Sequence, residues 1–205
     1  MNDTFAIKKA SFFKSMKNTG DYPGGDMPEI AVTGKSNAGK SSLINYLANN
    51  SKLAYVSKQP GKTRLINYFI INGNFYLVDL PGYGFARVSK SEKKSWSEMM
   101  QGYFDITRAL KGMILLTDIR HLPSEDDVLM ARWAAHYGIP LMIAATKADK
   151  VAKSKRINYL RKIVDAIRKG AEIEGEISAA AVSALQKSGG EKLLEFIGDK
   201  TGDEV

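Results

Sequence analysis

Residues 34–42 read GKSNAGKSS and follow the apolar stretch IAV at 30–32. They fit the pattern G-x-x-x-x-G-K-[ST], in which the glycines let consecutive backbone N–H groups turn inward. The lysine and the N-terminus of the following helix add positive potential there. The motif therefore predicts a polyphosphate cradle between a strand and a helix. Its expected residues are Gly34, Lys35, Ser36, Asn37, Ala38, Gly39, Lys40, Ser41 and Ser42.

Strand-like runs alternate with helix-like patterns along the chain, which is typical of an α/β fold with a mostly parallel sheet and helices on both faces. The turn INGN at 71–74 is too short for a crossover and predicts an antiparallel hairpin. The expected strands are 29–33, 65–71, 74–79, 111–117, 140–146 and 176–182, and the expected helices lie near 40–49, 92–104, 124–137, 152–170 and 189–198.

The length of 205 residues suits one domain with a sizeable core. We expect residues 1–27 to form a partly extended lead-in segment, residues 28–200 to form the domain, and residues 201–205 to be a short acidic tail. The sequence has no cysteine, which excludes disulfides, thiolate nucleophiles and cysteine zinc sites. It also shows no secretory signal and no membrane-length apolar run, so we predict a cytoplasmic protein without a membrane span.

The formal net charge of +8 favours a polyanionic partner, either nucleic acid or an anionic membrane surface. Positive residues concentrate in the segment 147–169 and in Lys8, Lys9, Lys14 and Lys17. The alternative is that these side chains are merely solvated surface. The three acidic residues of SEDD at 124–127 are better explained by the start of a helix, with Ser124 as N-cap, than by a metal site.

The tetrapeptide DLPG follows the apolar run 75–78. A carboxylate at a strand end can hold Mg²⁺, and the Gly82 N–H can meet a terminal phosphate oxygen. In isolation this pattern is an ordinary turn, and its value comes from its position after a strand. The expected site residues are Asp79, Leu80, Pro81 and Gly82.

The tetrapeptide TKAD follows the apolar run 141–145 and indicates which purine base is bound. The Asp149 carboxylate can accept hydrogen bonds from N1–H and the exocyclic amino group of guanine, while the stem of Lys147 lies along the ring. Adenine lacks both donors, and sites built to bond a polar group reject such analogues by about 10⁴-fold or more. The residues assigned to the base are Thr146, Lys147, Ala148 and Asp149.

Two further segments complete the expected site. In GKTR, Thr63 is positioned to give a hydroxyl to Mg²⁺ and an N–H to the terminal phosphate, and the assigned residues are Gly61, Lys62 and Thr63. In VSAL, the N–H groups of Ser183 and Ala184 are expected to reach the guanine carbonyl, and the assigned residues are Val182, Ser183 and Ala184. Residues 178–180 are a rival placement inside the last strand.

The segments GKSNAGKS, GKT, DLPG, TKAD and VSA, in this order, resemble the five motifs of translation-factor-class P-loop GTPases. The longer stretches SKQPGKTRLINYF, LVDLPGYGFA and DIRHLPSEDDVLM are similar to the EngB family of bacterial ribosome-biogenesis GTP-binding proteins. The resemblance implies a six-stranded G domain that uses GTP and Mg²⁺ and assists late assembly of the large ribosomal subunit. It also implies links to cell division and septation, and rRNA and ribosomal proteins as partners. We further expect a monomer.

Within this resemblance, the residues assigned to hydrolysis are Lys40, Thr63, Asn37 and Gly82, and those assigned to the metal are Ser41, Thr63 and Asp79. Tyr83 occupies the position where Ras-like enzymes carry a water-orienting Gln, and a phenol cannot replace that amide. We therefore predict slow intrinsic hydrolysis, helped by a loop residue, the ribosome or a cation. Asn37 supports the cation, because its amide oxygen can coordinate K⁺ between the phosphates. The alternative is that Asn37 simply tolerates a left-handed backbone.

Two alternative functions remain open from the sequence. An ATP-dependent P-loop kinase or ATPase shares the phosphate cradle, but it does not need a carboxylate that recognises guanine, as Asp149 is expected to do. A nucleotide-held RNA-binding scaffold, in which hydrolysis is incidental, is compatible with slow chemistry. Comparing GDP with ADP tests the first alternative, and comparing nucleotide states in subunit binding tests the second.

Overall fold

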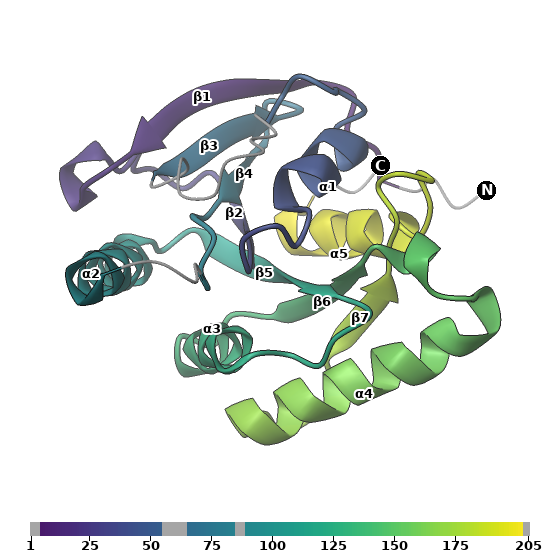
Figure 1. Ribbon diagram of the computed structural model, residues 1–205. Helices are drawn as coiled ribbons and strands as arrows, with labels where there is room; N and C mark the ends of the chain where they lie inside the picture. The colour runs from purple at the N-terminus through teal and green to yellow at the C-terminus, as the bar shows by residue number, and fades with distance from the viewer. Residues whose placement is uncertain (1–4, 55–64, 85–88, 203–205) are drawn as a thin grey trace.

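Strand β2, Glu29–Gly34, is buried along its whole length and lies fourth in a seven-stranded sheet ordered β1-β3-β4-β2-β5-β6-β7 (Figure 1). The computed structural model describes residues 5–54, 65–84 and 89–202. An apolar strand of this kind needs cover on both faces, which is why helices flank it on either side. The other strands are β1 Ala10–Met16, β3 Ile66–Ile71, β4 Phe75–Asp79, β5 Leu110–Asp118, β6 Leu141–Thr146 and β7 Ser178–Ala181.

The helices form two layers, one on each face of the sheet (Figure 1). Helices α1, Lys40–Leu47, and α5, Glu191–Thr201, bury their apolar side chains on one face. The opposite face is covered by α2 Lys90–Ile106, α3 Glu125–His136 and α4 Lys153–Ala171. Two short 3₁₀ helices, η1 Thr19–Asp21 and η2 Ala148–Lys150, complete the described part of the chain. None of its helices is long and apolar enough to cross a lipid bilayer.

The sheet confirms the predicted α/β class, with β3 as the single strand that runs against the others. Strands β4, β2, β5, β6 and β7 are parallel, and β3 is antiparallel to both of its neighbours, β1 and β4. The expected hairpin is present. Asn72 and Gly73 adopt positive φ angles of 53° and 81°, which is the backbone twist that a two-residue hairpin turn requires.

The sheet has seven strands, one more than the six expected, because the segment 1–27 contributes β1. This strand pairs with β3 along one edge only and has a register shift between Phe12 and Lys14. Three of its seven residues are exposed, including Phe12 at 55% and Phe13 at 44%, and only Met16 is buried. An edge strand that buries so little has a weak alternation of apolar and polar residues, so the sequence gives little sign of it.

A buried carboxylate joins three parts of the fold at the end of the sheet that lies opposite the phosphate loop. Glu29, at the start of β2, is 1% exposed and accepts hydrogen bonds from the hydroxyls of Tyr22, Tyr103 and Thr107, at 2.8, 2.8 and 3.1 Å. These donors come from the N-terminal segment and from the end of α2. Burial raises the pKa of Glu29, and the three donors oppose that rise.

Glu29→Gln is expected to remove a pH dependence of stability. Because the pKa of Glu29 is raised, the folded protein binds this proton more tightly than the unfolded chain does. The contribution of Glu29 to the free energy of unfolding should therefore fall as the pH rises from about 4.5 towards 7. Urea unfolding across that range should show the difference between the two proteins moving in favour of the variant. A difference that does not change with pH would contradict this assignment.

Candidate nucleotide-binding site

The loop between β2 and α1 has a backbone that few sequences can adopt. A Cβ added to Gly34 would lie 2.9 Å from both the Cβ and the carbonyl oxygen of Leu116 on β5, so a side chain does not fit there. Gly39 and Asn37 have positive φ angles of 97° and 65°. Glycine adopts this region at little cost, and asparagine is one of the few other residues that do so routinely. The glycines of the motif are thus explained by geometry.

Helix α1 starts without a cap from its own chain. Its N-cap is Gly39, no side chain caps it, and its first turn holds no acidic residue. Within the described residues, the backbone N–H groups of Lys40, Ser41 and Ser42 have no hydrogen-bond partner. Unpaired amides at a helix N-terminus favour an anion. The loop therefore presents the donors that a phosphate group needs.

Lys40 and Asp79 meet above this loop. The Lys40 ammonium contacts the Asp79 carboxylate at the end of β4, and both side chains are largely buried, at 11% and 5% exposure. A bound phosphate would compete with Asp79 for the ammonium group. The carboxylate would then be free to act as a hard oxygen ligand for a cation.

The donors at this place fit Mg²⁺. The described residues contain no cluster of three or more His, Cys, Asp or Glu side chains that could hold a metal alone. Mg²⁺ at a phosphate site needs few protein oxygens, because phosphate oxygens and water supply the rest. Asp79 and Ser41 provide one carboxylate and one hydroxyl. Gly61, Lys62 and Thr63, also assigned to the site from the sequence, lie outside the described residues.

A cavity of ≈ 600 Å³ opens beside the phosphate loop. One wall comes from the loop, α1 and the segment after it, and the other comes from the loops that follow β6 and β7. These loops lie at the carboxyl ends of parallel strands, where α/β sheets bind their ligands. The lining residues predicted from the sequence are Ala38, Gly39, Ser42, Thr146, Lys147, Asp149, Val182 and Ala184, and those not predicted include Asn45, Tyr46, Asn49 and Leu185.

The TKAD segment is fastened to the phosphate loop by two hydrogen bonds. The Thr146 hydroxyl donates to the carbonyl of Ala38 at 2.6 Å, and Lys147 Nζ donates to the carbonyl of Asn37 at 2.9 Å. Lys147 has a φ of 57°, which turns the chain sharply at the end of β6. The structure therefore holds the cavity and the phosphate loop in one fixed relation.

Asp118 was missed by the sequence analysis. Its carboxylate lies 3.0 Å from Lys147 Nζ and accepts two bonds from the Arg120 guanidinium, at 2.9 and 2.7 Å. Arg120 first, and then Lys147, hold the pKa of this carboxyl well below its usual value. The signal was present, because Asp118 ends β5 at the same edge of the sheet as Asp79 and Thr146.

Asp149 lies in the cavity wall with its side chain 8% exposed. The Ser183 hydroxyl donates to Asp149 Oδ1 at 2.7 Å, and this bond is the main reason why the pKa of the carboxyl lies below its usual value. Lys150 Nζ lies 3.5 Å from Oδ2 and acts in the same direction. Asp149 is thus held as a carboxylate in one orientation and can accept further N–H donors.

Ser183 does not have the role expected from the sequence. Its N–H donates to the carbonyl of Ser188 at 2.9 Å, and the Ser188 N–H donates to the carbonyl of Ser183 at 3.0 Å. The Ser183 amide is therefore already paired. Its hydroxyl instead orients Asp149. Ala184 then remains as the candidate amide donor for a base carbonyl, because the rival segment 178–180 lies within β7.

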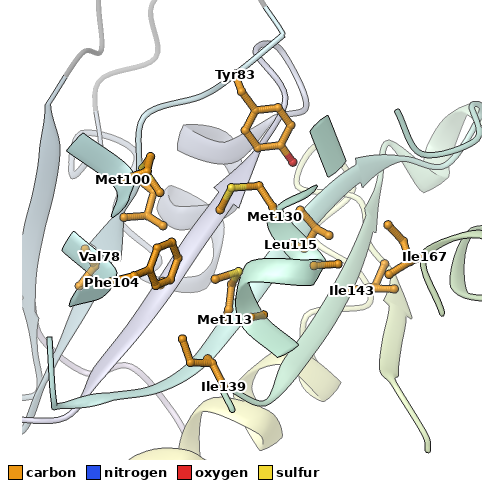
Figure 2. Close-up of a cluster of buried hydrophobic side chains, with 14 of the residues drawn as sticks. Val78, Tyr83, Met100, Phe104, Met113, Leu115, Met130, Ile139, Ile143 and Ile167 are labelled. Carbon is orange, nitrogen blue, oxygen red and sulfur yellow. The ribbon is translucent and has the colours of Figure 1, made fainter. Parts of the chain in front are cut away.

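Tyr83 points away from the phosphate loop and into the core. It is 4% exposed, and its hydroxyl donates to Asp127 Oδ1 on α3 at 2.7 Å. Figure 2 shows Tyr83 in the same buried cluster as Met130. Trp96 on α2 lies edge-on to the Tyr83 ring at 5.9 Å and donates to the carbonyl of Pro81 at 3.3 Å. The DLPG segment is therefore anchored to two helices.

Asp127 has a second role beyond the helix start expected for it. The expected N-cap is confirmed, because Ser124 and Asp127 form a reciprocal capping box at the start of α3. Asp127 is nevertheless 5% exposed and also accepts the Tyr83 hydroxyl. The backbone carbonyl of Tyr83 accepts from the N–H of Ser36 at 2.8 Å. The phosphate loop is thereby linked to α3 through a single residue.

These features place the chain among the P-loop NTPases. The phosphate loop, the carboxylate at the end of β4 and the cavity all lie at one edge of a mostly parallel sheet, which is the arrangement of that class.

A family model described as a 50S ribosome-binding GTPase matches residues 29–147. The chain is 46% identical over 196 residues to a probable GTP-binding protein EngB of Pelotomaculum thermopropionicum, covering 96% of this chain and 97% of that protein. The corresponding protein of Clostridium kluyveri is 47% identical, covering 93% and 95%. The chain therefore belongs to the EngB family of GTP-binding proteins, which decides against the ATP-dependent alternative.

The fold agrees with this assignment. A crystal structure of a probable GTP-binding protein engB matches with a TM-score of 0.63 at 24% identity, covering 86% of this chain and 100% of that chain. At this identity the match supports the fold alone.

Ser183→Ala is expected to weaken GDP binding and to change its pH dependence. Without the hydroxyl, the pKa of Asp149 rises, so the carboxylate is lost at a higher pH as the solution is acidified. At neutral pH we expect about 5- to 10-fold weaker binding, as for one hydrogen bond. Fluorescence titration with a labelled GDP from acidic to neutral pH measures both effects. Ser188→Ala is the matched control, and identical behaviour of the two variants would contradict the role of the hydroxyl.

Proposed function

We propose that this protein is a slow GTPase switch that assists assembly of the large ribosomal subunit in the cytoplasm, with the links to cell division and septation that the family resemblance implies. The observation that carries the proposal is the position of Asp149, held as a carboxylate in the wall of a cavity that opens beside the phosphate loop. The description of the matching family model, a 50S ribosome-binding GTPase, supports the choice of partner.

In this proposal the nucleotide lies across the carboxyl edge of the sheet. Asp149 accepts hydrogen bonds from N1–H and the amino group of guanine, and Lys147 lies along the ring. The Ala184 N–H donates to the carbonyl of the base. The phosphates accept hydrogen bonds from the unpaired amides at the start of α1 and contact the ammonium of Lys40. Gly82 and Thr63 are assigned to the third phosphate. The hydrogen bonds from Thr146 and Lys147 to the phosphate loop support this pose, because they fix the base cavity relative to the cradle.

We assign Mg²⁺ to Ser41 and Asp79, with Thr63 as a further ligand. When bound, the ion would neutralise charge between the outer phosphates. The Lys40 ammonium would move from Asp79 to a phosphate oxygen. The Asp79 carboxylate would then be free to bind the metal. The contact between Lys40 and Asp79 supports this exchange, because it shows that both groups reach the same point.

The environment of Tyr83 supports the proposal of slow intrinsic hydrolysis. The side chain that follows DLPG is bonded to Asp127 and packed against Trp96. It therefore does not point towards an attacking water, and burial raises its pKa well above the usual value, so the phenol stays protonated. A water-orienting group must come from elsewhere, such as the ribosome, a loop residue or a cation.

We further propose K⁺ as this cation, held by the amide oxygen of Asn37 between the phosphates. The exposed position of Asn37 in the loop supports the idea, although its φ of 65° also fits a purely conformational role.

Asn37→Gly separates these two roles, because glycine keeps the left-handed backbone and removes the amide oxygen. We expect wild-type turnover to be at least about tenfold faster in K⁺ than in Na⁺, as for one charge-stabilising contact. The variant should bind GDP normally and show equal rates in both salts. Equal wild-type rates in the two salts would remove the K⁺ proposal.

Co-sedimentation with purified 50S subunits tests the main proposal. A switch must bind one nucleotide state better, so we expect at least about tenfold tighter binding in either the GDP or the non-hydrolysable GTP state. Equal binding with GDP, with the GTP analogue and without nucleotide would favour the scaffold alternative. No binding in any state would reject the ribosomal partner.

A further inference from the structure

Almost all of the net charge of this protein lies in one segment. Residues 147–169 contain nine Lys or Arg and two Asp, a net +7 out of the chain's +8. The remaining 182 residues are close to neutral, with 21 basic and 20 acidic side chains. Helix α4 forms most of this segment. The electrostatic footprint of the protein is therefore one element of the fold and not its whole surface.

Five of the seven basic side chains of α4 are exposed, and Arg156 and Arg168 are half-buried. Ile163 and Ile167 are buried against the rest of the core, at 1% and 0% exposure. Lys155, Arg161 and Lys162 are exposed on the other side of the helix. Lys155 and Lys162 lie two turns apart, about 10 Å along the axis. Figure 1 shows α4 at the outer edge of the molecule.

An aromatic side chain lies among these charges. Tyr159 is 39% exposed and is four residues after Lys155 and three before Lys162, so all three share one surface of the helix. Ile157, at 67% exposure, lies four residues before Arg161. Exposed rings between basic side chains fit nucleic acid, because the ring can stack on a base while the cations take phosphates.

The charges of α4 are poorly neutralised by the protein itself. Among the described residues, the ion pair on this helix is Arg168 with Asp165 at 3.9 Å, and Lys155, Arg161 and Lys162 have no carboxylate partner. The first turn of α4 has no acidic residue and no side-chain cap, whereas α3 begins with three carboxylates. Basic residues at a helix N-terminus oppose the helix dipole, so they do not serve the stability of the helix.

The helix favours RNA over a lipid surface. A membrane-surface helix inserts its apolar face into the bilayer, but the apolar stripe of α4, formed by Leu160, Ile163, Val164 and Ile167, already packs against the protein core. Acidic residues at 172, 174 and 176 follow the helix, so the basic surface is centred on its first half. A phosphate backbone can follow such a narrow charged ridge without any insertion.

We propose that the exposed side of α4, with Lys155, Tyr159 and Lys162 on one surface and Arg161 on the adjoining flank beside Ile157, binds the phosphate backbone of RNA. The proposal rests on the ribosomal function proposed above and names the part of the protein that contacts the ribosome's RNA. It does not depend on which nucleotide state binds the subunit better.

The test is binding of a deproteinised 23S rRNA transcript by the full chain saturated with GDP, measured by filter retention over a range of salt. The variant Lys155→Glu, Arg161→Glu, Lys162→Glu is compared with Lys93→Glu, Lys111→Glu, Lys192→Glu, which makes the same charge change at exposed lysines of α2, β5 and α5. We expect the α4 variant to bind at least about tenfold more weakly. The slope of log K against log salt concentration (the salt slope) should become less steep by about 2 to 3. Unchanged GDP affinity and thermal unfolding show that the variants are folded.

Equal losses in the two variants would overturn the proposal, because the attraction would then be a property of net charge. Absence of wild-type binding would also overturn it, as would tighter binding to phosphatidylglycerol vesicles than to the transcript at equal salt. The ribosomal switch fails separately, if 50S binding by the wild type does not depend on nucleotide. Tyr159→Ala should weaken RNA binding without changing the salt slope, which a purely electrostatic surface would not show.

Discussion

The unpaired amides at the start of α1 are the constraint on which the rest of the site depends. They exist because Gly39 caps the helix without a side chain and because Gly34 lets the loop pass against Leu116. A helix end left open in this way is stabilised when an anion binds it. The hydrogen bonds from Thr146 and Lys147 then tie the base cavity to the same loop. In the proposed pose, the groups that bind phosphate and the groups that bind the base are therefore held together by two side-chain hydrogen bonds.

Several groups that a nucleotide would use have partners within the chain. Lys40 contacts Asp79, and the Ser36 N–H bonds the carbonyl of Tyr83. The Tyr83 side chain is held by Asp127 and Trp96. Any movement of the DLPG segment towards a third phosphate must therefore disturb a packed aromatic cluster that spans α2 and α3. These contacts join the DLPG segment to α2 and α3.

The sequence predicted the fold class, the six parallel and hairpin strands and the five helices, because long apolar runs and a fixed glycine motif have few alternative structures. It did not predict β1, an edge strand in which only Met16 is buried. It assigned Ser183 through its backbone, whereas the hydroxyl makes the contact that matters. It also did not predict the partner of Tyr83, since the bond to Asp127 joins residues 44 positions apart and leaves no local pattern.

Nucleotide specificity of Asp149→Asn tests the central claim most directly. Xanthine differs from guanine by a carbonyl in place of the amino group, so an amide side chain at this position pairs with xanthine and loses a bond to guanine. The account predicts that GDP affinity falls by about 10²-fold or more, while XDP affinity rises above that of the wild type. Unchanged preference for GDP over XDP in the variant would contradict the assignment of the cavity to the base.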